Sequence, residues 1–597
     1  MSTDTNEIVI PRFCHTWTPE QRFNLAVVCL YVVNTTSWSY NEKERIFRRT
    51  LIAGIFKHLG VEDENEKDLL QQILKDENNT PNLEFLVNSF INAKDAESKE
   101  TKDIRSEVIT DLLLICMGFS AELITDTQDT QEPQEPSSAT ERMNLKDRLD
   151  KLFDKTVEEL EQVVENEKSS DPVKIKPAEY DARARAILFK VSDLLKCPSS
   201  DVLKHENALA QQLYFIQQEH ETNVKKDDNL HKLQSSANET VTKHDKRKQK
   251  LRWLATGVGV LVGATAIGIT GGLAAPFVAV GLGAITGGIF ITSSSLALIT
   301  GLFGIAGGGL AGYKMRKRTR GLHEFEFKQI EQKQHELPQI PSLYLNVVIS
   351  GYLLDDCNEV TTPWLPTFQD AAEYHDTYAL TFDSEILQSL GKAFRRFLAE
   401  HAVKMAANEV IKHTVFGLLA SALFLPAALI KAGDLIDNPW ALGIDRAAKA
   451  GLILADVLSE RVQGKRPTVL TLTYRQIGYS LGALVIWECL QELARREEYG
   501  LIDSVILIGG PITAEHLEKW ELASTVVSRR IVNAYATNDL VLAVVYRMHS
   551  LDLNVAGLRA VNSPRVENYD VTSYTSGHLG YKEPGTLTKI LKRIGVE

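Results

Sequence analysis

The chain contains few cysteines, and their spacing excludes several classes of protein. Its 597 residues include six cysteines, which are far apart and form no Cys-x-x-Cys pair. This spacing provides neither a zinc-finger ligand set nor a disulfide framework, and it is typical of reduced thiols in the cytosol. We therefore expect no metal and no other cofactor. The cysteines are Cys14, Cys29, Cys116, Cys197, Cys357 and Cys489.

The chain also has no excess of positive charge, and its opening residues contain no long apolar run. There are 66 basic and 78 acidic residues, so the formal net charge is -12. A balance of this sign argues against binding to nucleic acid. The opening residues, "MSTDTNEIVIPRF", contain two acids and no long apolar run, which predicts that there is no N-terminal signal peptide.

One long stretch lacks charge altogether. About 60 residues between Arg252 and Lys314 contain no charged side chain, whereas one spanning helix needs about 20 apolar residues. The stretch predicts a glycine-rich transmembrane hairpin with spans at about 254–274 and 277–299, the remainder forming a third span or a re-entrant segment. The alternative is a pair of Gly/Ala-rich helices buried in a soluble protein.

Basic residues flank this stretch on both sides and predict its topology. Cytoplasmic flanks carry the excess of Lys and Arg, so both ends are expected in the cytosol. We therefore expect an integral protein of an internal membrane (endoplasmic reticulum, Golgi or endosome) with cytosolic N- and C-terminal regions. The flanking residues are Lys243, Lys246, Arg247, Lys248, Lys250 and Arg252 on one side, and Lys314, Arg316, Lys317, Arg318 and Arg320 on the other.

Changes in composition divide the chain into six predicted regions. Apolar residues at helical spacing predict helices before and after an acidic stretch rich in Pro and Ser, "TDTQDTQEPQEPSSATER", which has too little apolar surface to fold. The polar run "QQEHETNVKKDDNLHKLQ" is either a coiled coil or a solvated surface helix. The regions are a helical N-terminal region (1–120), the acidic linker (121–145), a helical or coiled-coil region (146–252), the membrane segment (253–313), a basic connecting helix (314–337) and an α/β-hydrolase-like domain (338–597).

The last of these regions alternates apolar strand patterns with helical ones, which is typical of an α/β domain. We expect a helix at about 386–413 and strands at 343–353, 376–385, 468–474, 504–511, 530–542 and 564–572. The predicted fold class is thus an α/β-hydrolase-like C-terminal domain combined with an all-helical N-terminal region and a transmembrane hairpin.

A Gly-x-Ser-x-Gly motif follows the third of these strands. It consists of Gly478, Tyr479, Ser480, Leu481 and Gly482, and the amphipathic stretch "ALVIWECLQELARR" comes after it. The motif alone is common by chance. Between a strand and a helix, however, it predicts a nucleophile elbow, in which glycines permit a tight turn that exposes the serine.

The order of residues after the motif supplies two partners for Ser480. Asp539 comes just after a predicted strand, and His578 lies in a Gly-bounded loop after the final strand. Separately, Asp539 could be a turn former and His578 a surface histidine, but together they complete the order Ser, acid, His. His578 would accept the serine proton and Asp539 would orient the imidazole. The predicted oxyanion hole combines the backbone N–H of Leu481 with one from Gly351 or Tyr352.

The same residues resemble a known family. The matching stretches cover about residues 176 to 585 and include "EYDARARAILFKV", "GVGVLVGATAIGITGGLAAPFVAVGLGAI", "LIDNPWALGIDRAAKAGLILADVLSERVQGKRP", "GYSLGA", "NDLVL" and "GHLGY". They are similar to the membrane-associated, α/β-hydrolase-like proteins named after transmembrane and coiled-coil domain-containing protein 4, with domain of unknown function 726. The resemblance implies a glycine-rich membrane segment and a hydrolase-like domain. Members are often named as lipases, and one fungal relative is described as a partner of a clathrin adaptor.

The chain departs from the family pattern next to the motif. Relatives have a short strand of the kind "RPVTLIGYSLGA", whereas "RPTVLTLTYRQIGYSLGA" contains about six additional residues. Either the strand bulges so that Arg475 and Gln476 reach solvent, or "TLTYRQ" is an artefact of gene prediction, which the sequence favours. A smaller departure is Leu484, where the family usually has Arg. The apolar segment 414–440 is a cap over an acyl chain, a helix against the membrane, or an ordinary buried helix.

Two functions follow from these observations. The first is a membrane-anchored serine esterase or lipase that hydrolyses a lipid or acyl ester through Ser480, with membrane lipids as its partners. The second is a hydrolase-like scaffold with little or no activity that binds a trafficking adaptor protein. The sequence gives neither the substrate nor the oligomeric state.

Overall fold

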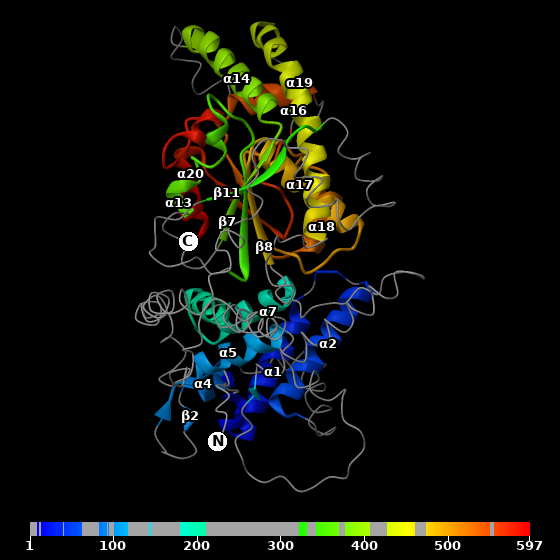
Figure 1. Cartoon of the computed structure of the whole chain (residues 1–597), viewed down its shortest axis with the longest axis vertical. Coiled ribbons are helices and arrows are strands. Elements are labelled where there is room, and N and C mark those ends of the chain that lie inside the picture. The colour runs from blue at the N-terminus through cyan, green and yellow to red at the C-terminus, as the bar shows by residue number, and fades with distance from the viewer. Residues whose placement is uncertain are drawn as a thin grey trace, which may run out of the picture. The chain divides into compact units, whose positions relative to one another are not determined.

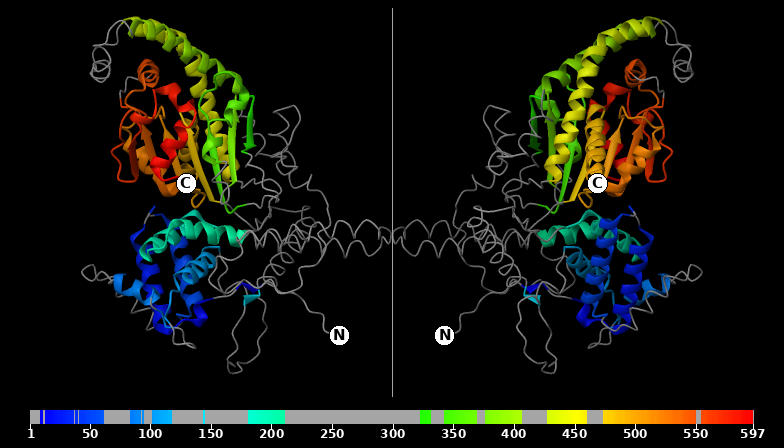
Figure 2. Two further views of the ribbon diagram at one scale, coloured as in Figure 1. Left: turned by 90° about the vertical axis from the view of Figure 1, so that its left-hand side faces the viewer. Right: turned by 90° about the vertical axis from the view of Figure 1, so that its right-hand side faces the viewer.

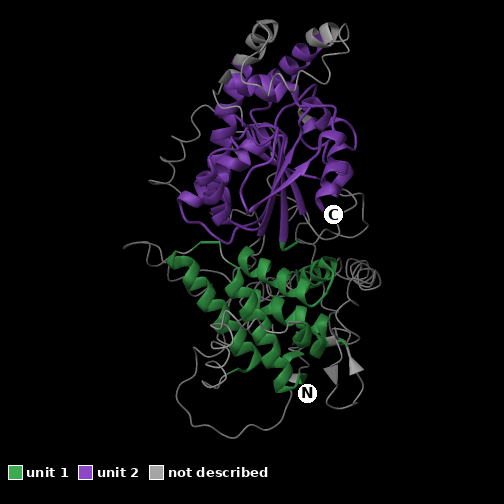
Figure 3. Cartoon of the chain, turned by 180° about the vertical axis from the view of Figure 1, so that it is seen from behind, with its two compact units in different colours: residues 1–287, 336–343, 465–471 green, residues 288–335, 344–464, 472–597 purple. Residues whose placement is uncertain are grey.

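The computed structural model of the chain separates into two compact units (Figure 3). Unit 1 comprises residues 1–287, 336–343 and 465–471, and unit 2 comprises residues 288–335, 344–464 and 472–597. The residues described are 9–10, 13–36, 38–39, 41–61, 83–91, 93–94, 101–117, 143–144, 180–210, 322–330, 342–368, 376–405, 427–459, 473–549 and 554–596.

Unit 1 is built mainly from helices. They are α1 (Pro19–Thr35), α2 (Glu42–Leu59), α4 (Leu83–Ile91), α5 (Arg105–Cys116) and α7 (Ala182–Leu194). Two-residue strands pair antiparallel, β1 (Val9–Ile10) with β4 (Met143–Asn144) and β2 (Ala93–Lys94) with β3 (Thr101–Lys102). Local signals explain the ends of the first two helices. Thr18 begins α1 with a capping box, and Gly60 ends α2 in the left-handed conformation.

The core of unit 1 contains charged side chains that are paired. Arg185 is fully buried and donates to both carboxylate oxygens of Glu206, at 2.7 and 2.9 Å. Arg183 contacts Glu44 at 3.0 Å. Pairing of this kind offsets the large cost of removing a charge from water.

Unit 2 is organised around a mixed sheet of seven strands in the order β11-β10-β9-β8-β6-β7-β5 (Figure 1). β5 pairs antiparallel with β7, and all the other neighbours are parallel. The strands are β5 (Phe325–Gln329), β6 (Tyr344–Ile349), β7 (Asp376–Phe382), β8 (Thr473–Tyr479), β9 (Ile502–Ile508), β10 (Val527–Tyr535) and β11 (Val566–Asp570). β8 and β9 are buried along their whole length, as expected for central strands covered on both faces.

Helices cover both faces of this sheet. α17 (Leu481–Arg495) packs between β8 and α16 (Ala427–Ser459), with α18 (Leu517–Val526) on the same side (Figure 1). α13 (Leu365–Phe368) and α20 (Thr586–Ile594) lie together on the opposite side. α14 (Ser384–Met405) packs against α16, and α19 (Leu540–His549) follows β10. α14 and α16 extend together beyond the ends of the strands (Figure 2).

The predicted fold class was wrong in its transmembrane hairpin. Among the described residues, no helix is long and apolar enough to cross a membrane. The longest of these helices, α16, carries Asp445, Arg446, Lys449 and Asp456, whose charges are incompatible with a lipid-embedded span. Residues 253–313, for which the hairpin was predicted, lie outside the described residues. The architecture that is present is the mixed seven-stranded sheet with its helices.

Two other details of unit 2 differ from expectation. Phe325–Gln329 form the edge strand β5, although a connecting helix was predicted for 314–337. The alternation of Phe325 and Phe327 with Glu326 and Lys328 is a strand pattern that was overlooked. The strand before the motif was predicted at 468–474 but spans Thr473–Tyr479. A strand that feeds a tight turn must be continuous up to that turn, so "TYRQIGY" occupies the sheet.

Four of the extra residues, 473–476, therefore lie in β8, the central strand of the sheet, while residues 471 and 472 lie outside the described residues. The pairing of β8 with β9 shifts register between Tyr474 and Arg475, yet this irregularity does not bring the side chains to solvent. Arg475 is 8% exposed and lies 5.0 Å from the ring centre of Tyr344, and Gln476 is fully buried. The explanation that required solvent exposure is wrong. The alternative, an artefact of gene prediction, stays a prediction.

Replacing Gln476 with methionine should stabilise unit 2. The Gln476 carboxamide oxygen is buried and has no hydrogen-bond partner among the residues that the structure describes, and the amide nitrogen contacts the Cys489 sulfur at 3.8 Å. Methionine keeps the side-chain length and removes the unsatisfied amide, so we expect a gain of about 1 kcal/mol, or roughly 2–4 °C in the melting temperature. Differential scanning calorimetry measures this shift. Gln491→Met is the control, because Gln491 donates to the Lys519 carbonyl at 3.0 Å and should gain nothing.

Candidate active site

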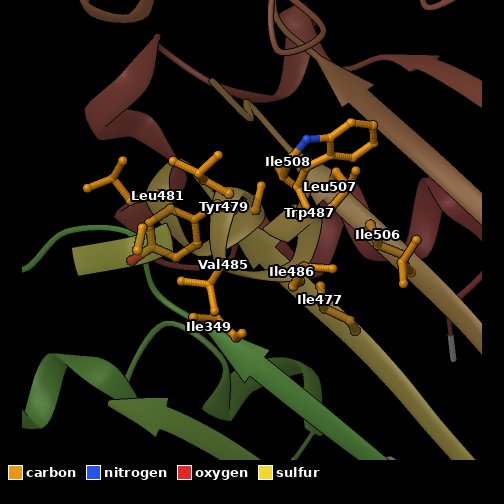
Figure 4. Close-up of a cluster of buried hydrophobic side chains, with 14 of the residues drawn as sticks. Ile349, Ile477, Tyr479, Leu481, Val485, Ile486, Trp487, Ile506, Leu507 and Ile508 are labelled. Carbon is orange, nitrogen blue, oxygen red and sulfur yellow. The ribbon is translucent and has the colours of Figure 1, made fainter. Parts of the chain in front are cut away.

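Ser480 occupies the turn between the central strand and the helix that follows it. β8 ends at Tyr479 and α17 begins at Leu481, so the turn consists of this one residue. Its backbone has φ 54° and ψ -126°, a conformation that a residue with a side chain adopts only under strain. Its N–H donates to the Ile508 carbonyl of β9 at 2.9 Å. The predicted nucleophile elbow therefore has the geometry of such a turn, and the core around it is shown in Figure 4.

Three glycines allow the chain to approach itself closely at this turn. A Cβ atom on Gly478 would lie 2.5 Å from the carbonyl carbon of Gly482, and one on Gly482 would lie 2.1 Å from the Ile349 oxygen. A Cβ atom on Gly351 would lie 2.2 Å from the Tyr479 oxygen and 2.4 Å from the Leu481 nitrogen. Backbone atoms cannot yield to such contacts, so the glycines of the motif and of the loop after β6 are required for packing.

The structure brings the three predicted catalytic side chains into one hydrogen-bonded chain. Ser480 Oγ lies 2.8 Å from His578 Nε2, and His578 Nδ1 lies 2.6 Å from Asp539 Oδ2. The other oxygen of Asp539 accepts the Leu542 N–H at 2.9 Å, at the start of α19. These contacts join positions 98 and 39 residues apart in the sequence. With this spacing His578 can accept a proton from Ser480 while Asp539 fixes the tautomer.

Aromatic rings hold the imidazole of His578 in place. Tyr352 stacks on it at 5.4 Å between ring centres and donates its hydroxyl to the His578 carbonyl at 2.7 Å. Phe394 of α14 meets the ring edge-on at 5.1 Å. Gly577, with φ 119°, provides the left-handed turn that directs His578 toward the serine. Burial raises the pKa of the Tyr352 hydroxyl well above its ordinary value, so this group remains a donor.

The residues predicted for the oxyanion hole lie beside the nucleophile. The N–H of Leu481 is in the first turn of α17, where a backbone donor has no acceptor within its own helix. Gly351 lies against it, as the Cβ distance of 2.4 Å shows. The next N–H in the loop after Tyr352, that of Leu353, already donates to the Leu387 carbonyl at 3.0 Å. Their role in binding an oxyanion stays a prediction.

Sequence reasoning missed an ion pair that joins the two loops of the site. Glu359 accepts the backbone N–H groups of Leu354 and Asp355 at 2.6 and 3.0 Å, and it pairs with Lys582 in the turn of His578. Burial alone would raise the pKa of Glu359, but hydrogen bonds from Lys582 and the Leu354 N–H outweigh it and lower this pKa below its ordinary value. One carboxylate thus connects the loop after β6 to the histidine turn. No short motif marks such a pair.

Glu359→Gln should slow the reaction of Ser480 and change the acid sensitivity of the fold. Because the pKa of Glu359 is lowered in the folded chain, its charge stabilises the fold fully above the ordinary carboxyl pKa, and this contribution is lost as the pH falls through the lowered pKa. We expect the variant to melt below the wild type at pH 7 and the difference to shrink below about pH 4.5. Labelling of Ser480 by a fluorophosphonate should slow about tenfold.

A double-mutant cycle with Lys582→Met provides the control for this pair. If the two side chains act together, the double variant should lose little more melting temperature and labelling rate than either single variant does. If the two single losses of melting temperature and labelling rate add up in the double variant, the proposed link between the loops is contradicted.

Comparison with known proteins places this site in a family. The description "Protein of unknown function (DUF726)" matches residues 247–597, which include the whole of the hydrogen-bonded chain. The chain belongs to the DUF726 family. This confirms the family suggested by the sequence.

Several relatives are similar to this chain over part of its length. The transmembrane and coiled-coil domain-containing protein STS1 of Oryza sativa subsp. japonica is 35% identical over 369 residues, 59% of this chain and 53% of the rice protein. An uncharacterised membrane protein of Schizosaccharomyces pombe is 35% identical over 434 residues, 70% of this chain and 69% of the relative. A protein of Saccharomyces cerevisiae named "Probable lipase MIL1" is 29% identical over 439 residues, 70% of this chain and 37% of the yeast protein.

The comparisons provide relatives of known sequence and no relative of known structure. The chain spans about half the length of the rice relative. No solved structure matches it.

Proposed function

We propose that this DUF726 protein is a serine esterase or lipase that hydrolyses a lipid or acyl ester. The observation that carries the proposal is the buried chain of hydrogen bonds from Ser480 through His578 to Asp539, with distances of 2.8 and 2.6 Å. A strained serine at a strand-to-helix turn, next to a histidine that is itself held by a carboxylate, is an arrangement suited to acyl transfer.

The reaction follows from the roles of these groups. Ser480 Oγ attacks the ester carbonyl while His578 Nε2 accepts the serine proton. The tetrahedral oxyanion is stabilised by the N–H of Leu481 together with that of Gly351 or Tyr352. His578 then protonates the departing alcohol, which leaves an acyl group on Ser480. Water, activated by the same histidine, releases the acid and restores the serine.

The class of substrate is proposed from the relatives. The yeast relative is named a probable lipase, and others are named membrane proteins. We propose that this chain likewise associates with an internal membrane, with its N- and C-terminal regions in the cytosol, and that membrane lipids are its substrates. Lipid esters present the acyl carbonyl at the membrane surface, where such a protein would meet them.

Release of fatty acid from vesicles tests the proposal. The purified full-length chain would be incubated with phospholipid and diacylglycerol vesicles, and the free fatty acids would be measured by mass spectrometry. We expect release that is lost in Ser480→Ala. Absence of any Ser480-dependent release, with the protein folded, would overturn the proposal in favour of a scaffold that binds a trafficking adaptor protein.

A further inference from the structure

The serine and histidine of the site are closed off from solvent. Ser480 is 0% exposed and His578 is 2% exposed. A nucleophile in this position cannot reach the carbonyl of a lipid ester, however well its hydrogen bonds are arranged. If the proposed chemistry takes place, part of the surrounding structure must move first.

The described contacts identify the covering elements as α14 and α16. Phe394 of α14 touches the His578 ring at 5.1 Å and the Trp440 ring of α16 at 6.1 Å between ring centres. Three residues on from Trp440, Gly443 packs against Leu481, where an added Cβ atom would lie 2.7 Å from the leucine Cδ1. Leu390 of α14 lies beside the same glycine, with its Cδ2 3.6 Å from the added Cβ atom. The cover is therefore formed by Leu390 and Phe394 of α14 and by Trp440 and Gly443 of α16.

Trp440 is the member of this cover whose environment is least favourable. Its side chain is 0% exposed, and its indole N–H finds no hydrogen-bond partner among the described residues. Buried tryptophan N–H groups ordinarily donate to an acceptor, as that of Trp520 does to the Thr513 carbonyl at 2.9 Å. The closed position thus leaves Trp440 with an unsatisfied polar group that an open position would satisfy.

The segment around Trp440 is also built to bend and to meet an apolar surface. Pro439 lies inside α16, where a proline removes one backbone hydrogen bond and weakens the helix. On the outer side of the same turn Leu442 is 39% exposed, and among the described leucines Leu522, at 41%, is the other one with such exposure. Tryptophan favours the membrane interface, because its ring is apolar and its N–H reaches water or a headgroup.

We infer that Phe394 of α14 and the turn of α16 that carries Trp440 form a removable cover over Ser480, and that a lipid surface opens it by taking up Trp440 and Leu442. The inference rests on the proposed function, since it concerns access to the same serine. The partner is the surface of a bilayer. Its ester carbonyls then face the uncovered Ser480 and His578.

The rate of labelling by a fluorophosphonate tests this cover. The full-length chain, taken from the supernatant of a high-speed spin, would be labelled in detergent-free buffer with and without phosphatidylcholine vesicles. We expect the wild type to label at least tenfold faster with vesicles. Trp440→Ala should label rapidly without them, so that the ratio of the two rates falls toward one.

Two further variants keep the test decisive. Trp520→Ala removes another fully buried tryptophan from the same unit, and it should keep the vesicle ratio of the wild type. Gly443→Ala favours the helix but places a methyl group against Leu481, so it should also speed labelling without vesicles. If Trp440→Ala does not fold, Gly443→Ala tests the cover in its place.

The outcomes separate the two proposals. Labelling that requires Ser480 but is equally fast with and without vesicles would overturn the cover and leave the esterase proposal standing. A wild-type vesicle ratio in both Trp440→Ala and Gly443→Ala would also overturn the cover. Absence of Ser480-dependent labelling in every form, with all of them folded, would overturn the proposed function itself.

Discussion

Replacing Ser480 with alanine should abolish covalent labelling by a fluorophosphonate and reduce ester hydrolysis by about 10⁴- to 10⁶-fold. The expectation rests on the 2.8 Å contact between Ser480 Oγ and His578 Nε2, which identifies this hydroxyl as the one that can be deprotonated. Alanine fits the same turn and removes only the oxygen. The measurement is gel fluorescence of the labelled full-length chain, followed by the rate of fatty-acid release.

A second serine provides the matched control. Ser504 is buried in the neighbouring strand β9 and donates to Asp503 at 2.6 Å, and no part of the proposed reaction involves it. Ser504→Ala should keep its labelling. Labelling that persists in Ser480→Ala would show that another residue is the nucleophile and would contradict the assignment.

Replacing Asp539 with asparagine should lower the rate of hydrolysis on the order of 10⁴-fold while leaving Ser480 in place. The carboxylate accepts a hydrogen bond from His578 Nδ1–H at 2.6 Å, and this bond holds the tautomer in which Nε2 is free to take the serine proton. An amide at this position can donate to Nδ1 instead, and the imidazole would then present the wrong tautomer to Ser480. Steady-state hydrolysis and the labelling rate should fall together.

Asp570 is the control for this substitution. It is the last residue of the parallel strand β11 and accepts the Thr572 N–H at 2.9 Å, and no step of the proposed reaction involves it. Asp570→Asn should keep most of the activity. A small effect of Asp539→Asn, comparable to that of the control, would mean that the aspartate only stabilises the turn before α19.

The strand-to-helix turn shows how far sequence reasoning reaches and where it stops. The motif, the following amphipathic helix and the chain order of Asp539 and His578 were enough to select three residues that lie within hydrogen-bonding distance. The position of β8 was not predicted correctly, because "TVLTLTY" resembles a strand better than "TYRQIGY" does. Local preference favoured a strand that ends at Tyr474, whereas continuity with the turn extends the strand to Tyr479.

The amino-acid sequence by itself determined the α/β pattern of the C-terminal part, the position of the turn at Ser480 and the family to which the protein belongs. These features depend on local pattern, spacing and residue identity. Only the tertiary structure decided that Glu359 joins Leu354 to Lys582, that Arg475 is buried, and that Phe394 packs against both His578 and Trp440. Such contacts join segments tens to hundreds of residues apart. No local pattern specifies them, because they follow from how the helices pack on the sheet.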